Sequence, residues 1–235
     1  MLDTNLLHQP CLDQLCRAFD KGLLTKTLLL SGSKGIGKHL AAQHIAAHIL
    51  NQTRLIEPQQ PHARTAHPDL IELAPADNAA CISIDQIREL QHTIQQTTHT
   101  GKARVVILFP AESLNTMASN AMLKTLEAPD SNTYFILISH APQQLLSTIQ
   151  SRCHEIKLSL PAESLSKSWL KQRIIDADQQ TIDLLMHFSF ARPSIALQLH
   201  QQEQLSHYQS MYTTIVDYFA QRVSVQTVID AANKQ

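Results

Sequence analysis

The sequence predicts an α/β fold, with a parallel five-stranded sheet flanked by helices, then a small helical lid and a short helical tail. Five short apolar runs alternate with segments of helical period as far as residue 160, a pattern typical of strands joined by crossover helices. After Pro161 only helical patterns remain. We therefore expect a sheet domain over 1–160, a helical lid over 161–204 and a helical collar-like segment over 205–235.

The first part of the expected sheet domain reads as helix, strand, helix and loop. Apolar residues recur at helical spacing over 4–19, where Pro10 interrupts the pattern. The apolar run 25–31 ends at a glycine and predicts a buried strand, and an amphipathic helix follows Lys38. Residues 51–68 are polar and contain three prolines, which predicts a loop.

Four more strands complete the predicted sheet, and helices separate them. These strands are expected over 69–73, 104–109, 133–139 and 154–160. Asp85 is the expected N-cap of the next helix, which Gly101 ends. A further helix over 114–126 stops at Pro129, and 145–149 predicts a short one. Beyond the sheet, helices are expected over 162–175, 178–189, 193–204, 205–221 and 224–233.

Composition and charge exclude several classes of protein. Nineteen basic residues face twenty acidic ones, so the net charge of −1 gives no global attraction to nucleic acid, and a DNA contact has to be local. No apolar run is long enough to cross a membrane. The first residues lack the basic and apolar pattern of a secretory signal, so we expect a cytoplasmic protein with reduced thiols.

A glycine-rich loop follows the first predicted strand. It satisfies G-x-x-x-x-G-K with Gly32, Ser33, Lys34, Gly35, Ile36, Gly37 and Lys38, and His39 comes next. Small residues let backbone N–H groups turn toward phosphate oxygens, and the following helix adds the positive end of its dipole. Because a strand precedes and a helix follows, a nucleotide-binding loop is favoured over a plain glycine-rich turn.

The metal side of this loop departs from the usual pattern. His39 stands where a serine or threonine hydroxyl would hold magnesium, and imidazole prefers softer metals. The strand 104–109 ends in Phe109 rather than an aspartate, and Glu112 is expected on the helix beyond. We therefore expect a loop that binds phosphate, with ATP or ADP held without hydrolysis, and no metal site.

Arg152 lies in LLSTIQSRC, just before the last predicted strand. A guanidinium at the edge of a sheet domain can reach the γ-phosphate bound to an adjoining protein and stabilise the transition state. A surface arginine paired with a carboxylate is the alternative, and for this residue taken alone it is the more common arrangement.

Several segments together resemble one family. They are GSKGIGK, HPDLIEL (67–73), NAMLKTLEAP (120–129) and ISHAPQQLLSTIQSRC (138–153). At these spacings they are similar to the delta-prime family of bacterial DNA polymerase III clamp-loader subunits, which are AAA+ proteins related to the gamma/tau subunits. The resemblance covers roughly residues 10–200.

The resemblance implies a role for several residues and partners. Arg152 would act in trans on ATP held by a gamma/tau subunit, in a complex with the delta subunit, the sliding clamp and primer–template DNA. Lys124 and Glu127 would face the clamp or DNA, unless they belong to an ordinary solvated helix face. Arg192 would be a nucleotide sensor, or else an arginine near a helix cap.

The chain also departs from that family. Residues 51–66 contain no cysteine where many relatives carry a zinc module, so no zinc is expected. His44 and His48 lie one helical turn apart but without an evident third ligand, so they are interpreted as surface residues. The region after residue 205 is shorter than the usual collar, and it predicts a helix with an apolar face. This face either belongs to an abbreviated collar or packs on the lid of the same chain.

Three functions follow from these observations. The first is a clamp-loader subunit without ATPase activity that supplies Arg152 to a neighbour. The second is a self-contained P-loop NTPase that uses His39 and Glu112 in unusual ways. The third is a degenerate AAA+ adaptor that binds a replication partner outside the five-subunit complex. No carboxylate set indicates a polymerase site of its own, so a polymerase activity would belong to the holoenzyme.

Overall fold

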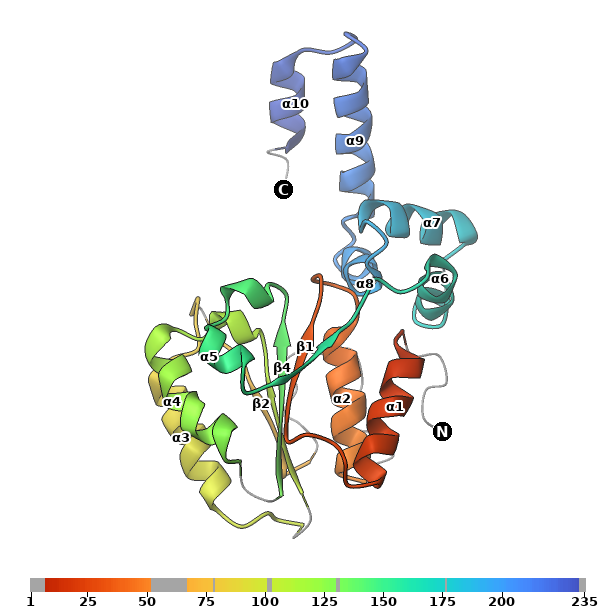
Figure 1. The fold of residues 1–235 in the computed structure, drawn as a ribbon. Helices are drawn as coiled ribbons and strands as arrows, with labels where there is room; N and C mark the ends of the chain where they lie inside the picture. Colours follow the sequence, from red (N-terminus) through yellow and green to blue (C-terminus); the bar gives the residue numbers. More distant parts are fainter. Residues whose placement is uncertain are drawn as a thin grey trace. The chain divides into compact units, whose positions relative to one another are not determined.

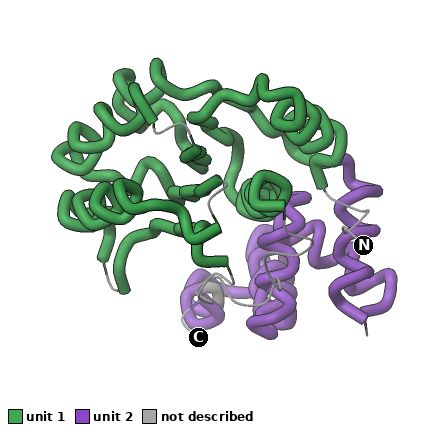
Figure 2. Tube along the Cα trace, turned by 90° about the horizontal axis from the view of Figure 1, so that it is seen from below, with its two compact units in different colours: residues 1–161 green, residues 162–235 purple. Residues whose placement is uncertain are grey.

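A computed structural model describes the chain over 7–51, 67–77, 79–100, 103–129, 132–175 and 177–232. It divides into two compact units, residues 1–161 and residues 162–235, which Figure 2 colours separately. Each unit has its own buried apolar residues and is considered by itself below.

The first unit is built on a parallel five-stranded sheet, as the sequence predicts (Figure 1). The strands are β1 (Thr27–Ser31), β2 (Leu70–Leu73), β3 (Arg104–Leu108), β4 (Thr133–Ser139) and β5 (His154–Lys157). Their order across the sheet is β2-β3-β4-β1-β5. The loops after β1, β3 and β4 therefore meet at the carboxyl edge of the sheet, where α/β proteins bind ligands.

Helices cover both faces of the sheet (Figure 1). They are α1 (Gln9–Asp20), α2 (Lys38–Ile49), α3 (Ile84–Gln95), α4 (Thr116–Glu127) and α5 (Ser147–Gln150), with 3-10 turns η1 (Ala111–Ser113) and η2 (Pro142–Gln144). Alternate residues of each central strand face opposite layers: Leu30 packs in the cluster with α1 and α2, and Leu29 in the cluster with α3 and α4. The continuous apolar runs arise because both faces are buried.

Three features at the ends of helices and strands differ from what the sequence predicts. The N-cap of α3 is Ser83 and not Asp85, because Ser83 and Gln86 form a reciprocal capping box. Pro10 does not interrupt α1 but lies in its first turn, where a missing N–H costs nothing. Strand β5 ends at Lys157, because its partner β1 ends at Ser31.

The second unit is helical. Its elements are α6 (Glu163–Lys171), α7 (Gln179–Phe188), α8 (Pro193–Gln201), α9 (Leu205–Phe219) and α10 (Val225–Ala232). The first three pack around buried Trp169, Leu170 and Leu185, and α10 packs along α9 (Figure 1). Among the helices described, none is both long and apolar enough to cross a membrane.

Candidate functional site

The glycine-rich loop joins β1 to α2 at the carboxyl edge of the sheet. Gly32, Gly35 and Gly37 have φ angles of 143°, 85° and 95°, in the region that favours glycine. A Cβ on Gly32 would lie 2.4 Å from the carbonyl oxygen of Leu158, so no other residue fits there. The loop therefore turns tightly onto the N-terminus of α2, a backbone arrangement that suits an anion.

Lys38, the first residue of α2, is folded back onto the loop. Its Nζ donates hydrogen bonds to the carbonyl oxygens of Gly32 and Ser33, both at 2.6 Å, and the residue is 3 % exposed. Burial lowers the pKa of Lys38 to about 8, although the nearby charge of Glu112 acts in the opposite direction. An incoming phosphate group would offer this ammonium better acceptors than two neutral carbonyls.

A contact that the sequence did not suggest holds the loop from the N-terminal side. The Nε2 of His8 donates to the carbonyl oxygen of Ile36 at 2.8 Å. Burial lowers the pKa of His8, the hydrogen bond to Ile36 opposes this, and the charge of Lys38 lowers it further. Leu7 fills the space beside Gly37, with its Cδ1 2.7 Å from where a Cβ would lie. No motif marks this contact.

Three rings gather on the metal side of the loop. The ring of Phe109, which follows β3, lies 5.2 Å from the ring of His39 and 5.5 Å from that of His140. His39 Nε2 accepts a hydrogen bond from Gln43 at 2.8 Å and lies 3.8 Å from Glu72 Oε1. Burial lowers the pKa of His39, while Glu72 acts to raise it. These aromatic rings offer no oxygen ligand to a hard cation such as Mg²⁺.

Glu112 lies on the 3-10 turn η1, before the helix on which the sequence predicts it. Its Oε1 accepts a hydrogen bond from the backbone N–H of His140 at 2.9 Å. Burial and the charge of Lys38 lower the pKa of His140 to about 4, although the charge of Glu112 acts to raise it. The ring is therefore neutral at pH 7. Among the residues described, no three His, Cys, Asp or Glu side chains are grouped to hold a metal ion.

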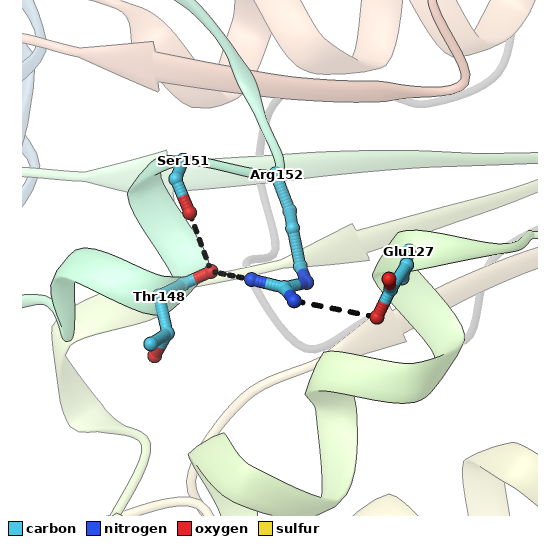
Figure 3. Close-up of polar contacts among 4 residues, drawn as sticks. All are labelled: Glu127, Thr148, Ser151 and Arg152. Atoms are coloured by element: carbon cyan, nitrogen blue, oxygen red, sulfur yellow. Dashed lines mark hydrogen bonds and ion pairs between the residues drawn. The ribbon is translucent and has the colours of Figure 1, made fainter.

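Arg152 lies in the turn between α5 and β5 and contacts its own chain (Figure 3). Its Nη1 donates to the carbonyl oxygen of Thr148 at 3.0 Å, and its Nη2 lies 3.3 Å from Glu127 Oε2. The carbonyl oxygen of Arg152 accepts a hydrogen bond from Thr27 Oγ1 at 2.7 Å, which fixes the backbone beside the start of β1.

The structure separates Arg152 from the glycine-rich loop of the same chain. His154 is in register with Leu28, so Arg152 lies level with the residue before β1, whereas the loop begins after Ser31 at the other end of that strand. At ~3.3 Å per residue the length of β1 alone separates them by roughly 13 Å. An extended arginine side chain covers roughly half of that distance.

The remaining candidate residues lie in different surroundings, and two of them have a partner within the chain. Arg192 is the N-cap residue of α8, and its Nε donates to the carbonyl oxygen of Ser189 at 2.8 Å. Lys124 is exposed in the last turn of α4. His48 pairs with Asp20 at 2.7 Å, whereas His44 is partly buried, which lowers its pKa. The cysteine-free stretch 51–66 lies almost entirely outside the described residues.

The segment HPDLIEL also carries a buried acid that the sequence analysis did not single out. Asp69 is fully buried, and it accepts hydrogen bonds from the backbone N–H groups of His99 and Thr100 and from Thr100 Oγ1. Burial alone would raise the pKa of Asp69, but these hydrogen bonds together hold it below its usual value. Asp69 therefore ties the start of β2 to the turn after α3.

Comparisons with known proteins show which family the chain is similar to. A family model described as DNA polymerase III, delta subunit matches residues 7–162. The subunit delta' of Pseudomonas aeruginosa is 38 % identical over 74 % of this chain and 55 % of its own length. The corresponding subunit of Haemophilus influenzae is 33 % identical over 82 % of this chain and 60 % of its own length. The chain thus spans somewhat more than half the length of these relatives.

Solved structures give the same fold. A gamma subunit-related protein of DNA polymerase III from Thermotoga maritima has a TM-score of 0.56 at 21 % identity, covering 85 % of this chain and 62 % of its own. The RuvB Holliday junction branch migration motor of Thermotoga maritima has a TM-score of 0.58 at 17 % identity, covering 95 % and 66 %. The solved structures share the fold, and the family match together with the curated relatives shows that the chain belongs to the DNA polymerase III delta' family.

Proposed function

We propose that the chain serves as a non-hydrolysing delta-prime subunit of a DNA polymerase III clamp loader. In this role it assembles with gamma/tau and delta subunits and helps to place the sliding clamp on primer–template DNA. Arg152 supplies a positive charge to ATP bound on an adjacent gamma/tau subunit. Membership of the delta' family supports the first part of this proposal, and the geometry of Arg152 supports the second.

The observation that carries the trans role is the distance between Arg152 and its own loop. The two lie at opposite ends of β1, so this arginine cannot serve a nucleotide held at Gly32–Lys38 of the same chain. Its guanidinium is partly accessible, with 30 % of the side chain exposed. A cation in this position is therefore available to a phosphate that another subunit brings to it.

Two features of the loop support a bound nucleotide phosphate without a magnesium ion. Glycines that cannot carry a Cβ, the N-terminus of α2 and the buried ammonium of Lys38 form a cradle for an anion. The rings of His39, Phe109 and His140 lie close together beside the loop and offer no oxygen ligand to a divalent cation. We therefore propose that ATP or ADP is held here without hydrolysis.

The proposed chemistry occurs on the neighbour. As the γ-phosphoryl group departs, negative charge develops on its oxygens, and a guanidinium that donates two parallel hydrogen bonds stabilises it. Arginines of this kind accelerate phosphoryl transfer by about 10³- to 10⁵-fold in systems where the effect is measured. Arg152 would supply this stabilisation of the transition state at the ATP site of the adjacent subunit.

The test is single-turnover ATP hydrolysis by a loader reconstituted with gamma/tau, delta, clamp and primed DNA. Arg152→Ala is expected to slow the ATP site beside this subunit by at least about 10²-fold, because charge stabilisation is lost there. Arg88→Ala is the matched control, since Arg88 is an exposed arginine of the same unit paired with Asp85. Equal hydrolysis rates for both variants and the wild type would remove the trans role.

A further inference from the structure

We propose that Glu127 is a positioning residue that competes with the neighbour's phosphate for the guanidinium of Arg152. In the free subunit the carboxylate holds the arginine, and engagement in trans requires this contact to open. The inference rests on the proposed trans role of Arg152, and it assigns Glu127 to the regulation of that site rather than to contact with the clamp or DNA.

The contact geometry is the first support. Figure 3 shows the guanidinium between the carboxylate of Glu127 and the carbonyl oxygen of Thr148, with one terminal nitrogen directed to each. The remaining nitrogen, Nε, is buried without a hydrogen-bond partner among the described residues. Part of the donor set that a phosphate would use in a bidentate contact is therefore already engaged within the chain.

The position of the pair explains why it forms. Glu127 is the last residue of α4, where a negative charge is unfavourable beside the negative end of the helix dipole. Thr148 contributes a carbonyl oxygen from the short helix α5. Arg152 thus lies where the Glu127 carboxylate, the C-terminal end of α4 and the carbonyl oxygen of Thr148 all favour a cation, and it compensates the poorly placed charge of Glu127.

The exposure of the pair indicates that it is weak. The Glu127 side chain is 65 % exposed and that of Arg152 is 30 % exposed. Exposed ion pairs of this kind change an equilibrium constant by about two- to fivefold. Such a contact holds the side chain in the free subunit but yields to a phosphate, which carries more charge and binds in an interface with less water.

The charge of Glu127 also acts after the arginine has engaged. Arg152 Nη2 lies 3.3 Å from the carboxylate, so a phosphate on the same guanidinium would be a close neighbour of that carboxylate. Two negative charges at such a distance repel each other, and they repel more strongly as water is excluded. Glu127 therefore opposes the trans contact both by holding the arginine and by repelling its target.

The experiment replaces Glu127 by glutamine in the reconstituted loader, because Glu127→Gln keeps the shape and the acceptor oxygen but removes the charge. The single-turnover hydrolysis rate at the site beside this subunit is expected to rise about two- to fivefold. Glu89→Gln is the matched control, since Glu89 is an exposed glutamate on α3 and its variant should retain the wild-type rate. The melting temperature of the subunit should change by no more than a degree or so.

A double-mutant comparison separates the outcomes. If Glu127 acts mainly by holding Arg152, Glu127→Gln gives a smaller increase in a subunit that already carries Arg152→Ala, because only the direct repulsion of the phosphate is then relieved. An unchanged or lower rate for Glu127→Gln, in a loader whose rate does depend on Arg152, overturns the competition and leaves the trans role intact. Insensitivity of the rate to Arg152→Ala overturns the trans role itself, and the inference falls with it.

Discussion

Lys38 shows how burial and charge set the behaviour of a single residue. Its ammonium is almost fully buried against two carbonyl oxygens, which lowers its pKa to about 8. A bound phosphate favours the protonated form and raises the pKa again. Binding above pH 8 therefore requires the uptake of a proton, and it becomes weaker as the pH rises.

We predict that the affinity of the isolated chain for ATP falls as the pH rises from 7 to 9. Titration calorimetry in buffers of different ionisation enthalpy measures both the affinity and the proton uptake. The Lys38→Met variant is the control: it should bind more weakly and lose the pH dependence over this range. An affinity of the wild-type chain that stays constant from pH 7 to 9 would contradict the role given to Lys38.

Asp69 gives a second prediction at this scale. Its pKa is held below the usual value, so its stabilising contribution is present above the unfolded pKa of about 3.9 and is lost as the pH falls through the lower folded pKa. Asp69→Asn should lower the free energy of unfolding at pH 7 by about 1–3 kcal/mol, because a buried charged acceptor of three hydrogen bonds is replaced.

Urea denaturation at pH 7 and pH 3 checks this expectation. Asp85→Asn is the control, since the Asp85 side chain is 82 % exposed and should contribute little. The difference between wild type and Asp69→Asn should shrink toward pH 3. Equal effects of the two substitutions at pH 7 would show that Asp69 does not stabilise the turn.

Among the elements, the start of α3 shows what a sequence pattern can and cannot assign. Ser83 and Gln86 satisfy the capping-box spacing S-x-x-Q, and that signal identifies the cap more strongly than the acidic residue Asp85 two positions on. The strand that the sequence predicts over 154–160 is longer than β5 for a different reason. Its alternating pattern continues past Lys157, but β1 ends at Ser31 and offers no further partner.

The capping box can be tested directly. Ser83→Ala should lower the free energy of unfolding by about 1 kcal/mol, because one N–H of the first turn loses its acceptor. The double variant with Gln86→Ala should cost less than the sum of the two single changes, since each side chain bonds the other's backbone. Strict additivity in urea denaturation would contradict a reciprocal box.

At the scale of the whole molecule, the sheet and the order of its elements can be predicted from periodicity, because buried parallel strands appear in the sequence as continuous apolar runs. No sequence pattern indicates that Arg152 pairs with Glu127. The same is true of the ring contacts among His39, Phe109 and His140. These side chains come from segments far apart in the chain, and only the folded topology brings them together. The residue types at His39 and Phe109 can be read from the sequence, but the contact between their rings cannot.

The tail illustrates the same limit. A helix with an apolar face is predicted over 205–221, and α9 is found at Leu205–Phe219. None of its residues is classed as buried, even though α10 packs along it. Phe219 is 79 % exposed, and Val216 and Tyr212 are also exposed. The helical pattern predicts the element and its apolar face. Part of that face contacts the lid, since the ring of Phe188 on α7 lies 6.2 Å from the ring of Tyr208 and 6.0 Å from that of Tyr212.

The most direct test of the account compares two subunits within one reconstituted loader, by single-turnover ATP hydrolysis in the presence of clamp and primed DNA. One subunit carries Lys38→Met, which impairs this chain's own loop, and the other carries Arg152→Ala. If Arg152 acts on ATP held by the neighbour, the rate stays within about twofold of wild type for Lys38→Met and falls by at least about 10²-fold at the adjacent site for Arg152→Ala. Loss of hydrolysis with Lys38→Met and a normal rate with Arg152→Ala would contradict it.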